Sequence, residues 1–401
     1  MESCVYLDNA ATSWPKPPEV ARAMADFLDR GAGNPGRGGH RLARLAQEPV
    51  DEVRTQLARM IHAPCADRVV MTHGCTDSVN MAIHGVIRGL LRRTPCRTPA
   101  VVTSCAEHNA VLRTLHCYAK SDVIDLTVID VDAEGAVDAE EFLAACTERT
   151  ALACLTHASN VLGTLQPVRE VGHGLRERAP DALLLVDAAQ TVGHMPVDVE
   201  AEAIDLLAIA GHKGLLGPTG TGALYVGPRA FPDEACASRL FCDRRGGTGA
   251  VARGLEMPET LPDALEAGTC NAVGFAGLAA GMAHAPADRH EREHRAVARL
   301  LEGLREIEGV TLYGRPTAED RLPTVLFNLK GRLARDVGAL MDHEYNICVR
   351  GGTHCAPLLH QHLGLGEAGG VRVSPGWATT EEDIERCLEA VRAVALTPVV
   401  S

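Results

Sequence analysis

One lysine in this chain lies where it could do covalent chemistry. Residues 208–222 read AIAGHKGLLGPTGTG, so Lys213 follows His212 after an apolar run and precedes a glycine-rich turn. Open α/β sheets bind their ligands at the carboxyl ends of strands. A partly desolvated lysine at such a place can form a Schiff base. A surface lysine in a polar turn would fit this segment alone equally well.

Polar side chains follow two further apolar runs. Asp187 ends the run Leu183-Leu-Leu-Val, so we expect its carboxylate to be buried and to need a cationic partner. A pyridinium nitrogen is such a partner, and keeping that nitrogen protonated makes its ring an electron sink. His108 follows another run. It could stack on an aromatic cofactor or shuttle protons, or it could simply belong to a polar cluster that caps a helix.

Small polar residues suggest where a phosphate could bind. Cys75 and Thr76 follow Gly74 at the start of a predicted helix, where backbone N–H groups and hydroxyls can hold a phosphate. Asp77 and Ser78 in the same segment could equally be ordinary helix caps. The amide of Asn160, in a turn after a third run, could bond a phenolic oxygen, although asparagine is common in turns.

The C-terminal third contributes a cysteine and an arginine. Cys355 lies in the glycine-rich segment RGGTHCAP, beside His354 and near Arg350. A partly exposed, locally electropositive loop favours the thiolate form of cysteine, but a cysteine could also fall in a loop by chance. Arg372 begins a predicted strand and could bind a carboxylate with its guanidinium group, or it could be a surface residue.

The elements that must position these residues alternate between short apolar runs and amphipathic segments, which predicts a mainly parallel sheet covered by helices. Seven strands are predicted first: Val69–Thr72, Ala100–Ser104, Leu126–Asp130, Ala151–Thr156, Ala182–Asp187, Leu206–Ala210 and Gly222–Val226. The intervening helices are Ser78–Leu91, Asn109–Lys120, Ala139–Cys146 and Val168–Arg178. The last two strands are joined without a helix, so we expect that pair to be antiparallel.

After about Leu265 the pattern changes to a smaller α+β unit. Its predicted strands are Val310–Tyr313, Thr324–Leu329, Ile347–Arg350 and Val371–Ser374. Its predicted helices are Arg289–Glu308, Ala334–Glu344 and Glu381–Val394. We therefore divide the chain into an N-terminal arm over residues 1–18, a large α/β domain over 19–265 and a small α+β domain over 266–401. The arm is rich in proline and small residues and is expected to be extended and outside the core.

Composition excludes several classes of function. The net charge of -13 and the 3% aromatic content argue against nucleic acid and anionic membranes as partners. The 14 cysteines include no C-x-x-C pair, so no metal site is predicted. No signal peptide and no apolar run of membrane-spanning length are seen. The cytoplasm, with reduced thiols, is therefore the expected compartment.

Taken together, these motifs resemble the cysteine desulfurase and selenocysteine lyase family, a class V aminotransferase-like group of fold type I pyridoxal-phosphate enzymes. The matching segments begin at Tyr6 (YLDNAATS), Asn34 (NPGR), Glu107 (EHN), Ser159 (SNVLGT), Val186 (VDAAQ), Gly211 (GHKGLLGPTGTG), Ala267 (AGT), Thr353 (THCAP) and Val371 (VRVS). They follow one another in the family's order from position 6 to beyond 370. The implied fold has a mainly parallel seven-stranded sheet with a smaller α+β C-terminal domain.

The resemblance implies a role for each residue, with pyridoxal 5'-phosphate as the cofactor. Lys213 would form the Schiff base, Asp187 would pair with the pyridine nitrogen and His108 would stack on the ring. Gln190 and Asn160 would lie near the phenolic oxygen, and Cys75, Thr76 and His212 would hold the phosphate, with Thr269 from a second subunit of a homodimer. Arg372 would bind the substrate carboxylate, and Cys355 would accept the sulfur.

Two positions depart from the family. Ala210 replaces a serine or threonine whose hydroxyl reaches the phosphate, and Trp377-Ala-Thr replaces an aromatic-Asn-Thr segment. The predicted reaction converts L-cysteine to L-alanine and leaves a persulfide on Cys355, which would pass its sulfur to an unidentified acceptor protein. Alternatives are a selenocysteine lyase, another C–S lyase or aminotransferase in which Cys355 is not essential, and a cofactor-binding scaffold without turnover.

Overall fold

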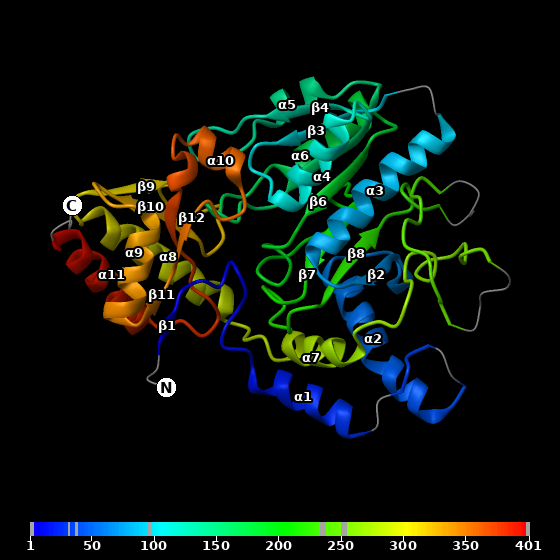
Figure 1. The fold of residues 1–401 in the computed structure, drawn as a ribbon, viewed down its shortest axis with the longest axis horizontal. Coiled ribbons are helices and arrows are strands. Elements are labelled where there is room, and N and C mark those ends of the chain that lie inside the picture. The colour runs from blue at the N-terminus through cyan, green and yellow to red at the C-terminus, as the bar shows by residue number, and fades with distance from the viewer. Residues whose placement is uncertain are drawn as a thin grey trace.

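A computed structural model describes residues 4–30, 33–36, 39–94, 98–232, 238–249 and 255–397. Arg37, at the end of the NPGR segment, lies outside the described residues, as do the first three residues of the predicted N-terminal arm. Two sheets organise the rest, a large one and a small one, with helices packed around each (Figure 1). Among the helices of the described ranges, none combines the length and the apolar character needed to cross a membrane.

The large sheet has seven strands in the order β2-β8-β7-β6-β5-β3-β4. Their bounds are β2 Val69–Thr72, β3 Ala100–Ser104, β4 Asp125–Ile129, β5 Thr150–Thr156, β6 Leu183–Asp187, β7 Leu206–Ala210 and β8 Gly222–Val226. Strands β4, β3, β5, β6 and β7 run parallel to one another. Strand β8 runs antiparallel to both β7 and β2, which confirms the expected antiparallel pair.

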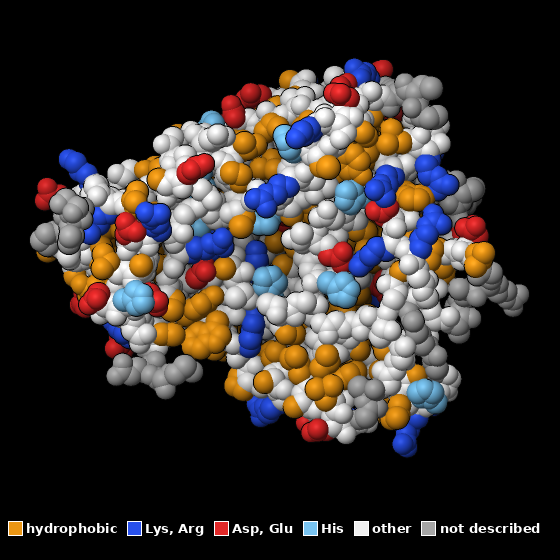
Figure 2. Space-filling view, in the orientation of Figure 1, with side chains coloured by type: hydrophobic (Ala, Val, Ile, Leu, Met, Phe, Trp, Pro, Cys, Tyr) orange, Lys and Arg blue, Asp and Glu red, His pale blue; other side chains and the backbone are white. Residues whose placement is uncertain are grey.

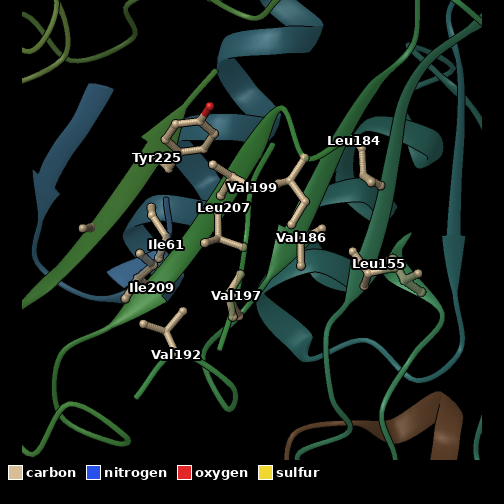
Figure 3. Close-up of a cluster of buried hydrophobic side chains, with 14 of the residues drawn as sticks. Ile61, Leu155, Leu184, Val186, Val192, Val197, Val199, Leu207, Ile209 and Tyr225 are labelled. Atoms are coloured by element: carbon tan, nitrogen blue, oxygen red, sulfur yellow. The ribbon is translucent and has the colours of Figure 1, made fainter. Parts of the chain in front are cut away.

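Helices cover both faces of the large sheet, because its central strands are apolar on both sides. The four predicted helices are present as α3 Cys75–Arg93, α4 Asn109–Lys120, α5 Ala139–Ala145 and α6 Val168–Arg178, and the ends of α3 and α5 differ from the prediction. Helix α3 begins three residues before the predicted start. Figure 3 shows one of the two buried clusters, in which Leu155, Val186, Leu207 and Ile209 of the sheet lie among the side chains drawn.

Three helices of this part were not predicted: α1 Pro18–Asp29, α2 Arg41–Met60 and α7 Ala272–Ala283. Helix α7 packs against α1 and α2, and its Phe275 and Leu278 belong to the buried cluster of the large sheet. The predicted domain boundary at residue 265 would separate α7 from this core. We therefore propose that the boundary falls after α7.

The small sheet has four antiparallel strands in the order β12-β13-β10-β9. Its strands are β9 Val310–Tyr313, β10 Val325–Leu329, β12 Arg350–Gly352 and β13 Gly370–Val373. Its helices are α8 Arg289–Arg305, α9 Ala334–Tyr345, α10 Pro357–His362 and α11 Glu381–Leu396. The predicted strand Ile347–Arg350 is in fact two strands, because β11 Ile347–Cys348 pairs elsewhere before the chain enters β12. Short 3₁₀ turns span Ala66–Arg68 and Gly366–Ala368.

The N-terminal segment is part of the core, contrary to the sequence prediction. Strand β1, Val5–Tyr6, pairs in parallel with β11, so a blue segment lies beside an orange one next to the small sheet (Figure 1). Val5 and Leu7 are buried in the cluster formed by the small sheet and its helices. The prediction of an arm outside the core is therefore wrong, because alternate apolar residues of the segment face this cluster.

Candidate active site

A cavity of about 630 Å³ lies between the carboxyl end of the large sheet and the loop that precedes α10. The chain brings ten of the eleven predicted site residues to its wall: Cys75, Thr76, His108, Asn160, Asp187, Gln190, His212, Lys213, Cys355 and Arg372. Lys, Arg and His side chains gather near the middle of the face drawn in Figure 2, whereas hydrophobic side chains dominate it over α1 and α7. The strand ends therefore converge as the sequence predicted.

Lys213 follows β7, in the turn that returns to β8. Burial lowers the pKa of its amine, and the negative charge of Asp187 opposes part of this shift. A lysine with a lowered pKa keeps a larger share of its amine neutral near neutral pH, as a nucleophile or a base requires. The surface-lysine alternative is excluded, because this side chain is only partly exposed and lines the cavity.

Asp187 ends β6 and is 6% exposed. Its Oδ1 accepts hydrogen bonds from the backbone N–H of Ala189 at 3.0 Å and from the thiol of Cys75 at 3.2 Å. Burial and the nearby Asp187 raise the pKa of that thiol well above its usual value, so Cys75 remains a protonated donor. The cavity thus contains a buried carboxylate that faces a site for a cationic group.

His108 caps a helix and also lies on the wall of the cavity. It is the N-cap of α4, where its Nδ1 accepts a hydrogen bond from the backbone N–H of Ala110 at 3.0 Å. The same ring lines the cavity. Burial is the main cause that lowers its pKa, so the ring is neutral and can lie against a flat ligand without adding charge.

The N-terminus of α3 and His212 form another part of the wall. The helix begins at Cys75 after Gly74, whose φ of 150° is readily adopted by glycine. The first N–H groups of a helix have no partners within it and favour anions. Burial, with Lys213 and Lys16 nearby, lowers the pKa of His212 to about 4, and its Nδ1 lies 3.1 Å from the hydroxyl of Thr12.

Cys355 enters the cavity from the small sheet's side. It is half-buried, and the Nη2 of Arg350 lies 3.5 Å from its sulfur. Two residues of the large sheet's part hold its loop. The amide of Asn160 donates to the carbonyl of His354 at 2.6 Å, and the backbone N–H of Asn109 donates to the carbonyl of Cys355 at 2.8 Å. The predicted electropositive setting is present, since Arg350 supplies the cation.

Arg372 is 1% exposed, and its guanidinium group already has partners within the protein. Its Nη2 pairs with the carboxylate of Asp8, and its Nη1 donates to the carbonyl of Asn160 at 2.8 Å. Its Nε is buried without a hydrogen-bond partner among the described residues. Asp8 was not among the predicted site residues. The only indication in the sequence was an acidic residue among apolar and small neighbours.

The N-terminal segment closes one side of the cavity. Ala10 and Ala11 line the cavity, and Gln190 donates its side-chain N–H to the carbonyl of Ala10 at 3.1 Å. The indole N–H of Trp377, one of the positions that depart from the family, donates to the carbonyl of Pro15 at 2.7 Å. Trp377 therefore binds this segment instead of completing the substrate side of the cavity.

Thr269 is the predicted site residue that lies apart. It lines a second cavity of about 400 Å³, with Arg54 and Glu266 on the wall. His73 lines both cavities, so they neighbour each other. Within one copy of the chain, Thr269 does not join the cavity of Lys213.

A buried ionic network lies behind Lys213, and the sequence analysis missed it. Arg289, on the first turn of α8, donates its Nε to Glu293 at 2.8 Å and its Nη1 to the carbonyl of Gly214 at 2.6 Å. His194 lies against both charged groups, with its Nδ1 3.1 Å from Glu293. Arg289 and Glu293 are at most 5% exposed. The network fixes the backbone position that follows Lys213.

The chain is similar to known proteins over nearly its whole length. The family model described as aminotransferase class-V matches residues 5–387. The chain belongs to this family. Within class V, a probable cysteine desulfurase of Methanothermobacter thermautotrophicus is 34% identical to this chain, over 98% of this chain and 94% of that protein. A cysteine desulfurase of Escherichia coli is 32% identical, over 97% and 93%.

Solved structures of class V desulfurases share the fold. The apo structure of a cysteine desulfurase from Thermococcus onnurineus matches with a TM-score of 0.87 and 32% identity, over 98% of this chain and 94% of that chain. A cysteine desulfurase of Escherichia coli matches with a TM-score of 0.83 and 27% identity, over 98% and 95%. The predicted fold type I architecture and the resemblance to cysteine desulfurases are both confirmed.

Proposed function

We propose that this chain is a pyridoxal-phosphate-dependent cysteine desulfurase that converts L-cysteine to L-alanine and leaves a persulfide on Cys355. One observation carries the proposal: a lysine, a buried carboxylate and a thiol from three different parts of the chain face the same cavity. The relatives that cover nearly the whole chain are named cysteine desulfurases, which supports the same activity. The selenocysteine lyase and aminotransferase alternatives have no comparable support.

The cavity fits the cofactor. Its volume of about 630 Å³ is in the range of small-molecule sites. In the protein alone, Asp187 accepts hydrogen bonds from a neutral thiol and a backbone N–H, and Lys213 lies near enough for the two charges to interact. Once Lys213 holds the cofactor, a protonated pyridine nitrogen would supply the cation that offsets the burial of Asp187. Bound pyridoxal phosphate supplies an electron sink for the electrons released at the substrate Cα.

The remaining predicted residues would bind the other parts of the cofactor. His108 would lie against the ring, and Gln190 and Asn160 would lie near the phenolic oxygen. Cys75, Thr76, His212 and the N-terminus of α3 would hold the phosphate. Lys213 would bind the cofactor covalently in the resting enzyme, and its amine, with its lowered pKa, would remove the proton from the substrate Cα once substrate has replaced it.

Cys355 would take the sulfur. Its thiolate would attack the sulfur of bound cysteine, so that an S–S bond forms while the substrate's C–S bond breaks. The electron pair of the broken bond would remain with the substrate Cβ, which would take up a proton. Lys213 would return a proton to Cα, and alanine would be released. The guanidinium of Arg350, 3.5 Å from the sulfur of Cys355, favours the negative charge that this attack requires.

Arg372 would bind the substrate carboxylate. Its pair with Asp8 means that the incoming carboxylate either displaces Asp8 or uses the unpartnered Nε. Both routes keep the arginine directed at the cavity, because its Nη1 remains on the carbonyl of Asn160. Asn160 would therefore contribute to the substrate site through its backbone as well as its amide.

Two further proposals concern the working enzyme. The active form would be a homodimer in which Thr269 of a second copy completes the phosphate site, since Thr269 lies outside the cavity of its own chain. All 12 cysteines of the described residues are free, and a persulfide-forming thiol needs a reducing compartment. We therefore place the enzyme in the cytoplasm, where a separate acceptor protein would collect the sulfur.

The substitution Cys355→Ser tests the function. After treatment with L-cysteine, mass spectrometry of the wild-type enzyme should detect one added sulfur on the peptide that contains Cys355, and the variant should show none. The variant should still bind pyridoxal phosphate, measured by visible absorbance. Alanine formed by the variant at the wild-type rate, or a keto acid product, would contradict the proposal. Turnover on L-selenocysteine compared with L-cysteine separates the lyase alternative.

A further inference from the structure

The loop that carries Cys355 has an unusual backbone. His354 and Cys355 have φ angles of 50° and 61°, so two successive non-glycine residues lie in the left-handed region. Side chains rarely adopt this region, and such residues persist where surrounding contacts hold them. The loop therefore depends on partners that keep both residues in this conformation.

Part of that support comes from the backbone. Asn160 and Asn109 donate to the carbonyls of His354 and Cys355, at 2.6 and 2.8 Å. The backbone N–H of Ala356 donates to the carbonyl of Thr353 at 3.0 Å. These bonds hold the peptide groups, but they leave open what holds the side chain of His354, which is 2% exposed.

His354 lies between the carbonyl of Arg350 and the ring of His360. Its Nε2 is 2.9 Å from that carbonyl, and its Nδ1 is 3.2 Å from the Nε2 of His360. A carbonyl oxygen only accepts, so the Nε2 of His354 must carry the hydrogen. Burial, with Arg372 next in effect, lowers the pKa of His354 to about 2, so the ring is neutral and its Nδ1 must accept.

The direction of the second bond follows. Since the Nδ1 of His354 accepts, the Nε2 of His360 must donate. Burial lowers the pKa of His360 to about 4, so this ring is also neutral and its Nδ1 carries no hydrogen. That Nδ1 is buried without a hydrogen-bond partner among the described residues. His360, on α10, is 0% exposed. Its one side-chain hydrogen bond in the described structure thus supports His354.

We propose that His360 is a positioning residue for sulfur transfer, which donates a hydrogen bond to His354 and thereby holds Cys355 in its left-handed conformation beside Arg350. The proposal rests on the proposed function, in which Cys355 is the nucleophile. His360 acts indirectly, because it lies behind the loop, whereas His354 and Cys355 line the cavity. Loss of His360 should therefore change the position of the Cys355 thiol and leave cofactor binding unchanged.

Three variants of the cofactor-loaded enzyme test this role. His360→Phe keeps an aromatic ring in the buried space but removes the N–H donor, so the Nδ1 of His354 loses its hydrogen-bond partner. His360→Gln places an amide N–H where the Nε2–H was and should restore the bond. His362→Phe is the matched control, because it makes the same change two residues further along α10 at an exposed position.

Persulfide on Cys355 is followed by mass spectrometry after mixing with L-cysteine, and cofactor content and cysteine binding are followed by visible absorbance. We expect persulfide formation to slow roughly tenfold or more in His360→Phe, since a buried acceptor loses its only donor. Persulfide formation should recover to within about threefold of wild type in His360→Gln. Cofactor content and cysteine binding should be unchanged in all three variants, and His362→Phe should match the wild type.

A second measurement does not require turnover. Iodoacetamide alkylation of Cys355, measured on its peptide in the absence of cysteine, should be severalfold faster in His360→Phe because the released loop exposes the thiol. Wild-type persulfide rates and unchanged alkylation in His360→Phe would overturn the proposal. An equal loss of cofactor binding and persulfide, not restored by glutamine, would overturn it as well. If the wild type itself forms no persulfide, the proposed function fails, and the alkylation result still tests His360.

Discussion

The two reactive side chains of the cavity are held in different ways. The loop of Lys213 is supported from behind by ions: Arg289 bonds the carbonyl of Gly214 and pairs with buried Glu293. The loop of Cys355 is supported by neutral groups: amide and backbone donors hold its carbonyls, and one histidine ring bonds another. Both side chains are only partly exposed, so the difference lies in the groups that support their loops.

This difference fits the tasks that we propose for the two residues. A lysine that holds a cofactor needs one fixed position, and a buried ion pair fixes its neighbours because separating the pair is strongly unfavourable. A thiol that receives sulfur inside the cavity and gives it to a partner outside needs access to both. Neutral hydrogen bonds, each of modest net strength, hold such a loop without the penalty of buried charge.

The largest effect should come from breaking the ionic support of Lys213. Replacing Arg289 with methionine leaves Glu293 buried without its cation and the carbonyl of Gly214 without its donor. We expect the free energy of unfolding to fall by about 3–5 kcal/mol, measured by urea denaturation. The variant should also retain less cofactor, because the backbone after Lys213 is released.

Arg299→Met is the matched control on the same helix. Arg299 pairs with Glu385 at the surface, where solvent weakens ion pairs, so we expect only a small fraction of the loss. Equal denaturation midpoints for the two variants would show that the buried network does not support the lysine loop, and the contrast between the two regions would disappear.

A second effect, which depends on pH, should arise next to His108. The adjacent Glu107 is 0% exposed and accepts hydrogen bonds from Ser104 and the N–H of Thr156 at 2.8 and 2.7 Å. Burial raises its pKa from 4.5 to about 8. Between these values the unfolded chain releases the proton that the folded protein keeps, so the stability that this carboxyl group contributes falls as the pH rises from 4.5 to 8.

Glu107→Gln imitates the protonated acid and should remove this loss. The free energy of unfolding of the variant, relative to wild type, should rise between pH 5 and pH 8 by at most about 1.4 kcal/mol per pH unit. Glu389→Gln, at an exposed position of α11, should show no such trend. If the free energies of unfolding of wild type and Glu107→Gln changed with pH in the same way, the carboxylate of Glu107 would be charged in the folded protein.

The smallest effect concerns Ala210, which ends β7 and lines the cavity. Ala210→Ser would add a hydroxyl within the region that we assign to the cofactor's phosphate. One hydrogen bond should tighten pyridoxal phosphate binding by roughly two- to tenfold, measured by titration of the cofactor-free protein. Ala208→Ser, on the same strand but fully buried, should not tighten it. Weaker binding of pyridoxal phosphate in Ala210→Ser would contradict the assignment of the phosphate to this position.

The sequence predicted the large sheet well because its strands are apolar runs separated by amphipathic helices, and these patterns are local. It missed α7 because residues 272–283 are almost all small or apolar and show no helical periodicity. The pattern for α2 was present, because its buried residues Ala46, Val50, Val53 and Leu57 recur at helical spacing. Pro49 within that stretch is the local signal against a helix, and packing overrides it.

The site was predictable where a residue follows a strand and is matched by a motif, as for Lys213, Asp187 and His108. The pair between Asp8 and Arg372 was not predictable, because 364 positions separate its members and only the folded chain brings them together. The same holds for Arg289, which reads as one charge among many on α8. Contacts between distant segments depend on packing, which local patterns do not encode.

The pairing of β1 with β11 has a consequence for the order in which the protein can be made. Val5 leaves the ribosome long before its partner Ile347 does. The large sheet can form during synthesis, since chains fold from the N-terminus as domains emerge. The N-terminal wall of the cavity, with Ala10 and Asp8, can take its place only after β11 has been made. A ribosome that stalls before β11 would therefore release a chain with a formed sheet and an open, incomplete cavity.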